Sequence, residues 1–409
     1  MLVAKHNFFS NALAFGFTAC LLLTYWSGAI AALGALSMGL AFVGLHYRVV
    51  WIVLRRNWLL MLYPVWCGIT VAWAVFPQKA LKLDILYFAT FVICLPIVSI
   101  IPIKRTTQFF CVLLSLTLVS VLLSSNTVSI FQTGEVVRIG VLGSKNNLSF
   151  IATFSLSAGA ILLAQSKNTA FDRLLALITI SLSLISILQA RSLGTVLSIG
   201  VCAGFGVFSY YSRVVTGYRH ARLFLIYGLA CCALIVAVGL ALFFTYDGYI
   251  ALMAELGKDA TITGRTFIWS IGLKSISENF WGGVGLASYW SEFNPDAVTI
   301  WIKGSRDIGV PYGFHNLYIN TWVETGIVGF LIMSAIVSKA LYRSLQTVFR
   351  QCSTEQVIAA TVGVYFFLKS FFEVPIFTAF SINTFYFFYI WIILNQTNLD
   401  QKSRGRRSQ

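Results

Sequence analysis

Three residues at the ends of apolar segments have side chains suited to phosphate binding and proton transfer. Arg191 stands between two apolar runs with almost no loop, Arg265 follows a Thr-Gly pair, and His315 opens a further apolar run. An arginine presents a planar fork of donors that fits phosphate oxygens, and a nearby helix start adds backbone N–H groups. A histidine, with an ordinary pKa near ~6.5, accepts a proton at neutral pH. Together these residues predict a site that binds a phosphate-bearing substrate and removes a proton.

Each of these residues also has a plainer interpretation. Arg191 could reach lipid phosphates as an interfacial arginine, Arg265 could be a solvated loop residue, and a lone histidine such as His315 is more often a cap. We favour function for Arg191 because helix ends hold it in place, and the two interpretations of Arg265 balance. The functional interpretation of His315 gains from the two arginines expected at the same membrane face.

Two more regions carry candidate residues. The segment from Arg138 to Asn147 is glycine-rich and basic and includes Lys145, so it could close over an anionic ligand or form a turn with solvated charges. Glu324 follows His315 by nine positions. In an ideal helix that spacing places it roughly 180° around and ~13 Å further along. We therefore expect Glu324 to pair within a helix bundle rather than to orient His315.

The sequence predicts no cofactor and no metal. The acids outside the apolar runs are scattered and do not form the carboxylate cluster that holds Mg²⁺ or Mn²⁺ in many phosphate-handling enzymes. There is no Walker motif and no Cys-x-x-Cys pair.

Membrane helices must position these residues. Of the 409 residues, 58% are hydrophobic and 11% are charged, and the mean hydropathy is +0.82. An ordinary soluble domain has about 25% charged residues, so we predict an all-α polytopic membrane protein formed by one integral membrane domain, 1–409. The net charge of +15 then indicates loops that face anionic membrane lipids, not nucleic acid. About twelve apolar runs reach spanning length: 8–26, 28–46, 58–76, 84–102, 108–124, 147–165, 172–190, 192–210, 222–245, 315–341, 355–372 and 376–395.

The basic residues predict the orientation. Eighteen of the twenty-nine lysines and arginines fall in the loops of one side and the termini, against six in the short loops of the other. The positive-inside rule places both termini in the cytoplasm and the long polar loop, 246–314, in the periplasm. That loop holds seven of the fourteen acids and its own short amphipathic helices, which is typical of a functional loop.

Several motifs resemble those of the O-antigen ligase and polymerase superfamily. The resemblance rests on four stretches that follow the family order: Arg138-x-Gly with Lys145-Asn146-Asn147; Ala190-Arg191-Ser192; Gly264-Arg265 with Gly282-Gly283-Val-Gly285; and His315-Asn316 with Glu324-Thr-Gly326-Ile-Val-Gly329.

The resemblance implies a GT-C-like glycosyltransferase of lipopolysaccharide biosynthesis in the bacterial inner membrane. An O-antigen ligase of this kind moves a glycan from undecaprenyl diphosphate to a lipid A-core sugar at the periplasmic face, without metal and with inversion. It implies His315 as the base and Arg191 and Arg265 as diphosphate ligands and stabilisers of the leaving charge. Further residues would bind the diphosphate or support the site: Arg138, Lys145, Asn316, Asn147 and Glu324.

Other functions remain open at this point. A polymerase of the same superfamily differs only in its acceptor, which is also lipid-diphosphate-linked. Relatives that glycosylate protein serines often carry an added C-terminal domain, and this chain stops soon after its last apolar run. A transporter or flippase of anionic lipid-linked glycans belongs to a different class, but it should place charges near the bilayer midplane, whereas these gather at one face.

Overall fold

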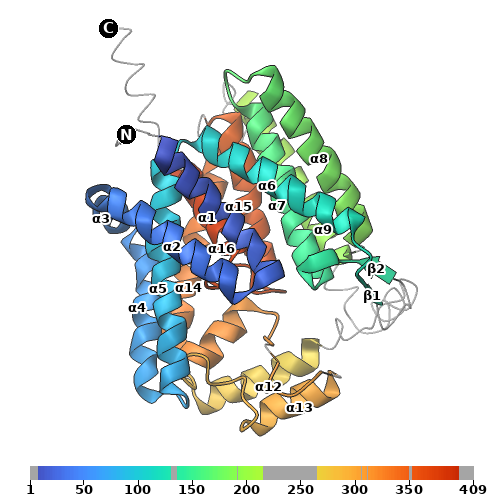
Figure 1. The fold of residues 1–409 in the computed structure, drawn as a ribbon. Coiled ribbons are helices and arrows are strands. Elements are labelled where there is room, and N and C mark those ends of the chain that lie inside the picture. The colour runs from blue at the N-terminus through green and yellow to red at the C-terminus, as the bar shows by residue number, and fades with distance from the viewer. Residues whose placement is uncertain are drawn as a thin grey trace.

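Helices make up most of the chain in the computed structural model, which describes residues 8–129, 136–190, 192–214, 265–304, 306–310, 312–349 and 352–395 (Figure 1). Within these ranges, strands β1 (Thr127–Ser129) and β2 (Val136–Arg138) form one antiparallel pair, in which Thr127 is opposite Arg138. The helices are α1 (Phe8–Ser27), α2 (Ala29–Leu45), α3 (Tyr47–Arg56), α4 (Trp58–Thr70), η1 (Val71–Trp73), α5 (Pro77–Ile100), α6 (Ile103–Leu123), η2 (Gly140–Leu142), α7 (Lys145–Ala164), α8 (Ala170–Ala190), α9 (Leu193–Val214), α12 (Arg265–Glu278), α13 (Pro295–Lys303), α14 (Leu317–Phe349), α15 (Thr354–Ser370) and α16 (Ile382–Asn395).

The chain is an all-α polytopic membrane protein. In the described ranges, seven helices are long and apolar enough to cross a bilayer, namely α1, α5, α6, α7, α8, α9 and α14. Helices α2 and α3 together would make an eighth span, although the chain bends by 98° between them. Eleven of the twelve predicted apolar runs coincide with described helices, and the run 222–245 lies outside the described residues.

One predicted boundary is wrong. The run 376–395 was expected to be helical throughout, but α16 begins only at Ile382. The preceding residues form a connection, 371–381, in which Phe377 and Phe380 have φ of 61° and 46° and side chains that are buried. Because this connection packs apolar side chains into the bundle, its hydropathy resembles that of a helix.

The connections between helices lie alternately on two sides of the bundle, and we call one of these the α12 side. The turn between α1 and α2, the start of α5, the segment before α7 and the connection 371–381 all line one cavity with the residues before α14. Helices α12 and α13 lie on this side, at the bottom of Figure 1. On the opposite side, Lys104 and Asp172 form an ion pair of 2.7 Å between the starts of α6 and α8. This alternation is expected of a chain that crosses a bilayer repeatedly.

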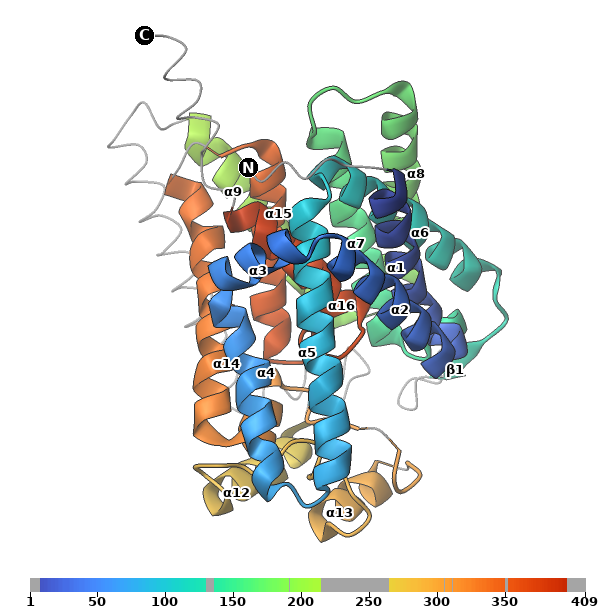
Figure 2. The ribbon, with the colours of Figure 1, turned by 60° about the vertical axis from the view of Figure 1, so that its left-hand side comes forward.

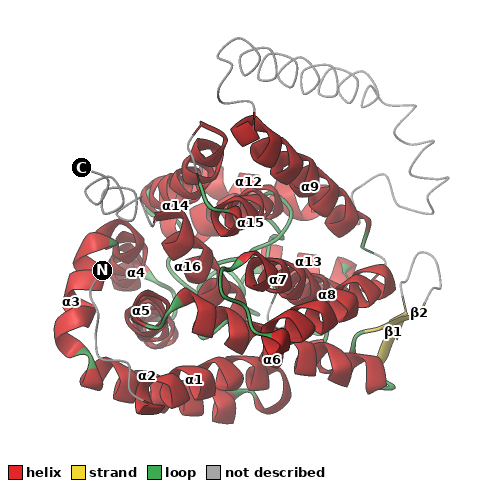
Figure 3. Ribbon diagram, turned by 90° about the horizontal axis from the view of Figure 1, so that it is seen from above, coloured by secondary structure: helices red, strands yellow, loops and turns green. Residues whose placement is uncertain are grey.

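The centre of the bundle is aromatic, with a few hydroxyl contacts between helices. Figure 3 shows α15 and α16 in the interior, with α1, α2 and α3 along one edge. Phe154 of α7 stacks on Tyr386 of α16 with ring centroids 4.5 Å apart, and the Tyr386 hydroxyl lies 2.7 Å from the Ser157 hydroxyl. Tyr389 makes a similar contact of 2.6 Å with Thr107 of α6. Such contacts satisfy polar groups that no water reaches and fix how the helices pack.

Helices α4, α5 and α14 run side by side toward α12 and α13 (Figure 2). Helix α14 is broken at Gly326, whose φ of 68° and ψ of −171° are not helical. The loop 280–285 lies against this break: the Ile327 N–H donates to the Phe280 carbonyl, and the Val284 N–H donates to the Val323 carbonyl. Trp66 of α4 closes the arrangement by donating from its indole to the Thr325 carbonyl, at 2.7 Å.

The close fit of loop and helix explains the glycine pattern of the sequence. A Cβ at Gly326 would lie 2.0 Å from the Trp281 carbonyl oxygen, and one at Gly283 would lie 2.6 Å from the Gly326 nitrogen. The Gly282-Gly283-Val-Gly285 and Glu324-x-Gly326 motifs therefore belong to one structural feature, where only glycine lets the two backbones meet.

Candidate active site

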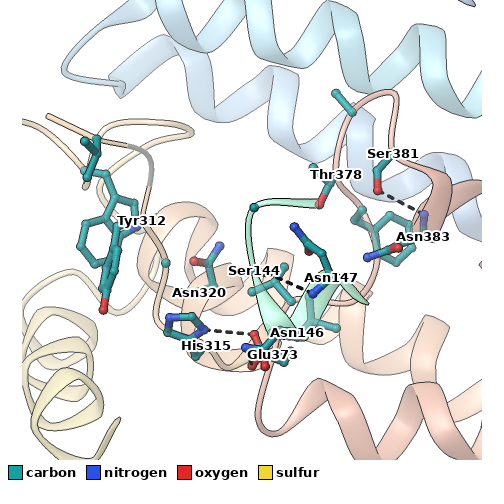
Figure 4. A pocket seen from close by; sticks show the side chains of 18 of the residues that line it. Ser144, Asn146, Asn147, Tyr312, His315, Asn320, Glu373, Thr378, Ser381 and Asn383 are labelled. Atoms are coloured by element: carbon teal, nitrogen blue, oxygen red, sulfur yellow. Dashed lines mark hydrogen bonds and ion pairs between the residues drawn. The ribbon is translucent and has the colours of Figure 1, made fainter. Parts of the chain in front are cut away.

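A cavity of about 1660 Å³ opens on the α12 side of the bundle. Its walls come from both ends of the chain and from the long loop, as described above. Figure 4 shows His315, Glu373 and Asn146 close together on one wall, with Tyr312 and Asn320 on neighbouring segments. A cavity of this size exceeds the usual range for drug-sized ligands and suits a large substrate.

The carboxylate of Glu373 brings together three segments that are far apart in the sequence. Its Oε1 accepts hydrogen bonds from Nη2 of Arg265, at 2.5 Å, and from Nδ2 of Asn146, at 2.7 Å. Its Oε2 lies 3.0 Å from Nδ1 of His315. Only 12% of the Glu373 side chain is exposed, so these contacts are shielded from solvent more than an ordinary surface ion pair. We call Arg265, His315, Glu373 and Asn146 the Glu373 cluster.

Local backbone contacts place His315 in the cluster. The preceding residue, Phe314, is fully buried, and its carbonyl accepts from the indole of Trp269 at 2.8 Å. The following residue, Asn316, caps α14 by accepting from the backbone N–H groups of Tyr318 and Ile319. Between these anchors His315 adopts a φ of 50°, which is uncommon for a residue other than glycine and recurs at functional sites.

Asn316 also positions the acid. Its Nδ2 donates to the carbonyl of Phe371 at 3.1 Å, two residues before Glu373. This bond ties the start of α14 to the connection that carries the carboxylate. The His-Asn pair in the sequence therefore has two complementary tasks: the histidine faces the cavity, and the asparagine fixes both the helix start and the neighbouring connection.

Electrostatics determine the protonation of the cluster. Burial alone would raise the pKa of Glu373, but the hydrogen bond from His315 and the charges of His315, Arg265 and Lys369 outweigh burial and lower that pKa. An ionised carboxylate can only accept hydrogen bonds, so Nδ1 of His315 must carry the proton in the 3.0 Å contact. When the ring is neutral, its Nε2 then has a free lone pair and is the basic atom.

The rest of the cavity wall is basic. The lining includes Lys79, Lys145, Lys303 and Arg306, against two acids, Glu324 and Glu373. One of these cations is fixed by an aromatic ring, since Nζ of Lys303 lies 3.7 Å from the ring centroid of Phe267. This balance favours an anionic ligand.

The structure brings some of the predicted site residues together and separates others. His315 and Lys145 line the cavity, and Arg265 joins His315 in the Glu373 cluster although it is not among the lining residues. Arg138 is in β2, where its Nη1 donates to the Leu122 carbonyl at the end of α6 at 2.7 Å, and it is not among the residues that line the cavity. Arg191 lies outside the described residues.

Asn147 and Glu324 also differ from their expected surroundings. Asn147 lines the cavity, but its Nδ2 donates to the carbonyl of Leu142 and so stabilises the turn before α7. Glu324 faces the same cavity as His315 and does not point away from it. Because α14 begins after His315, the two residues do not share one helix, and the expectation that Glu324 does not orient His315 stays a prediction.

Sequence reasoning missed Glu373 and Asn146, two of the four cluster members. Glu373 is an acid in the short polar gap between two apolar runs, the same signal that singled out Arg191. Applied to acids, the argument from charges near the membrane would have found it. Asn146 offered no such signal, because it differs from its neighbour Asn147 only in the direction of its side chain.

Comparison with known proteins gives two similarities. Residues 175–334 match a family model described as O-antigen ligase. Over this stretch the chain is similar to that family. It is also similar to the exopolysaccharide production protein ExoQ of Rhizobium meliloti (strain 1021), with 25% identity over 342 residues, which cover 80% of this chain and 74% of that protein.

These similarities support a ligase- or polymerase-type function with lipid-linked polysaccharide substrates. The matched stretch contains Arg191, Arg265, His315 and the glycine motifs at the α14 break. Two members of the Glu373 cluster, Asn146 and Glu373 itself, lie outside that stretch.

Proposed function

We propose that the protein is an O-antigen ligase. It transfers glycan from undecaprenyl diphosphate to a sugar of the lipid A core at the periplasmic face of the bacterial inner membrane. The observation that carries this proposal is the Glu373 cluster: one carboxylate holds both a histidine base and an arginine beside a large, basic cavity. This arrangement serves a reaction that removes a proton from one substrate and neutralises a leaving diphosphate on the other.

The chemical step is a single displacement. Nε2 of His315 takes the proton of the acceptor hydroxyl while the oxygen attacks the anomeric carbon of the donor glycan. A new glycosidic C–O bond forms as the bond to the diphosphate oxygen breaks, and the electron pair stays on the diphosphate. Arg265, Arg191 and Lys145 stabilise that charge. In-line attack inverts the configuration of the anomeric carbon, and the step as written needs no metal.

A second candidate is a polymerase of the same superfamily. The observation that favours it is the similarity to a relative named for exopolysaccharide production. In a polymerase the acceptor hydroxyl belongs to a second lipid-diphosphate-linked glycan. The same base and the same diphosphate ligands would serve that reaction, so the acceptor alone separates the two candidates.

Reconstitution tests the proposal. Purified protein in liposomes receives undecaprenyl-diphosphate-linked glycan together with either lipid A-core or a second lipid-linked repeat unit. We expect a new glycan-bearing product with lipid A-core and no chain extension in the other arm. Product in the second arm alone would identify a polymerase. Absence of product in both arms would refute glycan transfer by this protein.

Substitutions should distinguish the residues that bind the donor from the residue that acts as the base. Arg265→Ala or Arg191→Ala should lower the rate at least ~100-fold and weaken binding of the lipid-diphosphate donor, because each removes charge-assisted contacts to phosphate. Lysine should restore only part of the rate, since it lacks the two-pronged geometry. His315→Ala should abolish transfer and leave donor binding nearly intact, with partial relief at high pH.

The control for these variants is Arg55→Ala, an exposed arginine at the end of α3 on the opposite side of the bundle. It should transfer glycan at the normal rate. If His315→Ala lost donor affinity as severely as the arginine variants, His315 would be a phosphate ligand instead of a base.

A further inference from the structure

One wall of the cavity carries polar groups that the transfer step does not use. Asn320 and Glu324 both line the cavity from the first part of α14, and their spacing of four residues places them on one helix face. Lys79, in the first turn of α5, lines the cavity as well. This wall begins close to His315 and extends about two helical turns along α14.

The carboxylate of Glu324 is held in a fixed position. The α14 break at Gly326 and the bond from the Val284 N–H to the Val323 carbonyl lock the backbone on either side of it. Its side chain lines the cavity together with Ala287 and Lys79. Since loop 280–285 and α14 are interlocked, Glu324 cannot leave the wall without displacing both.

This fixed carboxylate has acceptor capacity left over. A carboxyl group has two oxygens that can form hydrogen bonds. In the part of the chain that the structure describes, no side chain donates a hydrogen bond to the carboxyl of Glu324, which lines the cavity. The carboxamide of Asn320 has no hydrogen-bond partner in that part of the chain, and Figure 4 shows it beside His315 at the cavity. Both groups can therefore bind a ligand.

Aromatic rings complete this part of the cavity. Tyr63 of α4 and Tyr87 of α5 line it, with ring centroids 6.3 Å apart. A surface that combines ring faces with fixed acceptors and donors matches the chemistry of a sugar, which has apolar C–H faces and a rim of hydroxyls. The carboxyl of Glu324 offers a diphosphate no cation, whereas Arg265 and the basic residues around the cluster do.

We propose that Asn320, Glu324 and Lys79 form the subsite for the acceptor saccharide and direct one of its hydroxyls toward His315. This assignment rests on the proposed function and adds the location of the acceptor to it. Glu324 accepts hydrogen bonds from sugar hydroxyls, and Asn320 donates to and accepts from others. The two substrates then bind at different walls of one cavity, with the diphosphate at the Glu373 cluster and the acceptor sugar along α14.

Binding of soluble sugars, measured without any donor, tests the subsite separately from catalysis. The probes are the core oligosaccharide released from a polymer-deficient lipopolysaccharide and the oligosaccharide of the glycan repeat unit. Dissociation constants are measured for the full-length protein in nanodiscs, with sugar-free undecaprenyl diphosphate as a separate ligand. The variants are Glu324→Gln and Asn320→Ala, and the matched control is Asp84→Asn, a buried acid of α5 that does not line the cavity.

We expect the normal protein and His315→Ala to bind one of the two oligosaccharides. Glu324→Gln should raise its dissociation constant about tenfold or more, because one of the two carboxyl oxygens that bond to the sugar is replaced by an NH2 group, and Asn320→Ala should raise it several-fold. Asp84→Asn should bind like the normal protein, and all variants should bind undecaprenyl diphosphate equally. In the transfer assay, Glu324→Gln should raise KM for the acceptor more than it lowers kcat.

The proposal is overturned if the normal protein binds neither oligosaccharide, or if Glu324→Gln binds the sugar unchanged. It is also overturned if Glu324→Gln loses undecaprenyl diphosphate binding as strongly as sugar binding. If Glu324→Gln unfolds at a lower temperature than the normal protein, Asn320→Ala decides, since no described fold contact depends on its carboxamide. Sugar binding without transfer to either acceptor would refute the proposed function and leave the subsite standing.

Discussion

At the scale of single residues, the site depends on one carboxylate that serves three partners. Glu373 orients the histidine ring through Nδ1, fixes the guanidinium of Arg265 and holds the side chain of Asn146. A histidine next to an ionised carboxylate keeps one tautomer and one orientation, which makes its other nitrogen a better base. Glu373 is therefore a positioning residue in the proposed mechanism, and His315 is the residue that meets the substrate.

Replacing Glu373 by glutamine should separate these roles. The amide keeps the shape, but it can donate to Nδ1 of His315, which moves the proton to Nε2 and removes the lone pair that acts as base. We expect kcat to fall at least ~100-fold, with donor binding changed only a few-fold. Steady-state transfer kinetics with purified protein measure both quantities. The control is Glu355→Gln, in the first turn of α15 at the opposite end of that helix, and a normal kcat in Glu373→Gln would contradict the positioning role.

We expect glycan transfer to need no metal, because of the residues that the site offers to the diphosphate. The sequence predicts no carboxylate cluster on the periplasmic loops, and the proposed mechanism assigns the diphosphate to arginines and lysines. Transfer should therefore keep its full rate in excess EDTA, measured in the reconstituted system. If activity disappears in EDTA and returns with Mg²⁺ or Mn²⁺, the site uses a set of ligands that the proposal lacks.

At the scale of elements, the break in α14 links the loop to the membrane bundle. Gly326 has a φ and ψ that are open almost only to glycine, and its Cα faces the backbone of Trp281. The break lets the first part of α14 take a direction that the rest of the helix does not share. The same packing presents Glu324 and Asn320 to the cavity, so a glycine motif in the sequence controls the shape of a binding wall.

Gly326→Ala should destabilise the protein by at least about 2 kcal/mol, because the added methyl group meets a strained backbone and a carbonyl oxygen together. Thermal unfolding in detergent measures the change in Tm. Gly44→Ala is the control: Gly44 lies in α2, and a Cβ there would have nothing within 4 Å. It should leave Tm unchanged or raise it slightly. Equal Tm values for the two variants would show that the break does not depend on glycine.

At the scale of the whole molecule, the chain crosses back and forth so that separate connections meet on the α12 side. Residues from α1 to the connection 371–381 line one cavity, although hundreds of positions separate them in the sequence. A site built this way has its chemistry at one face of a membrane bundle and rigid helices behind every group. This agrees with an enzyme that takes lipid-linked substrates from the bilayer and joins them at the surface.

The orientation can be tested with fusions. A reporter enzyme that is active only in the periplasm should be active when fused after Asp296, in α13, and silent when fused after Arg350. The expectation rests on the excess of lysine and arginine in the loops of the other side. Enzyme activity in whole cells, normalised to the amount of each fusion, is the measurement. The reverse pattern would place the cavity in the cytoplasm and rule out transfer at the periplasmic face.

The sequence by itself determined the class of the protein and most of its helices. Long apolar runs have few alternatives in a bilayer, because every backbone polar group must be satisfied within the segment, so eleven predicted runs coincide with described helices. It also singled out Arg265 and His315, both of which contact Glu373 in the structure, since a charged or titratable residue at the end of such a run is conspicuous. Hydropathy wrongly predicted a helix for 376–381, part of the connection 371–381, because this loop buries Phe377 and Phe380 as a helix would.

Only the tertiary structure decided which residues form the site. Glu373 lies 58 positions from His315, 108 from Arg265 and 227 from Asn146, and no local pattern specifies pairs at such separations. Their meeting depends on how α7, α12, α14 and α15 pack and on a helix that starts at Leu317 instead of at His315. The direction of a side chain depends on the residues at which its helix begins and breaks. The packing of the surrounding helices and loops determines which residues these are.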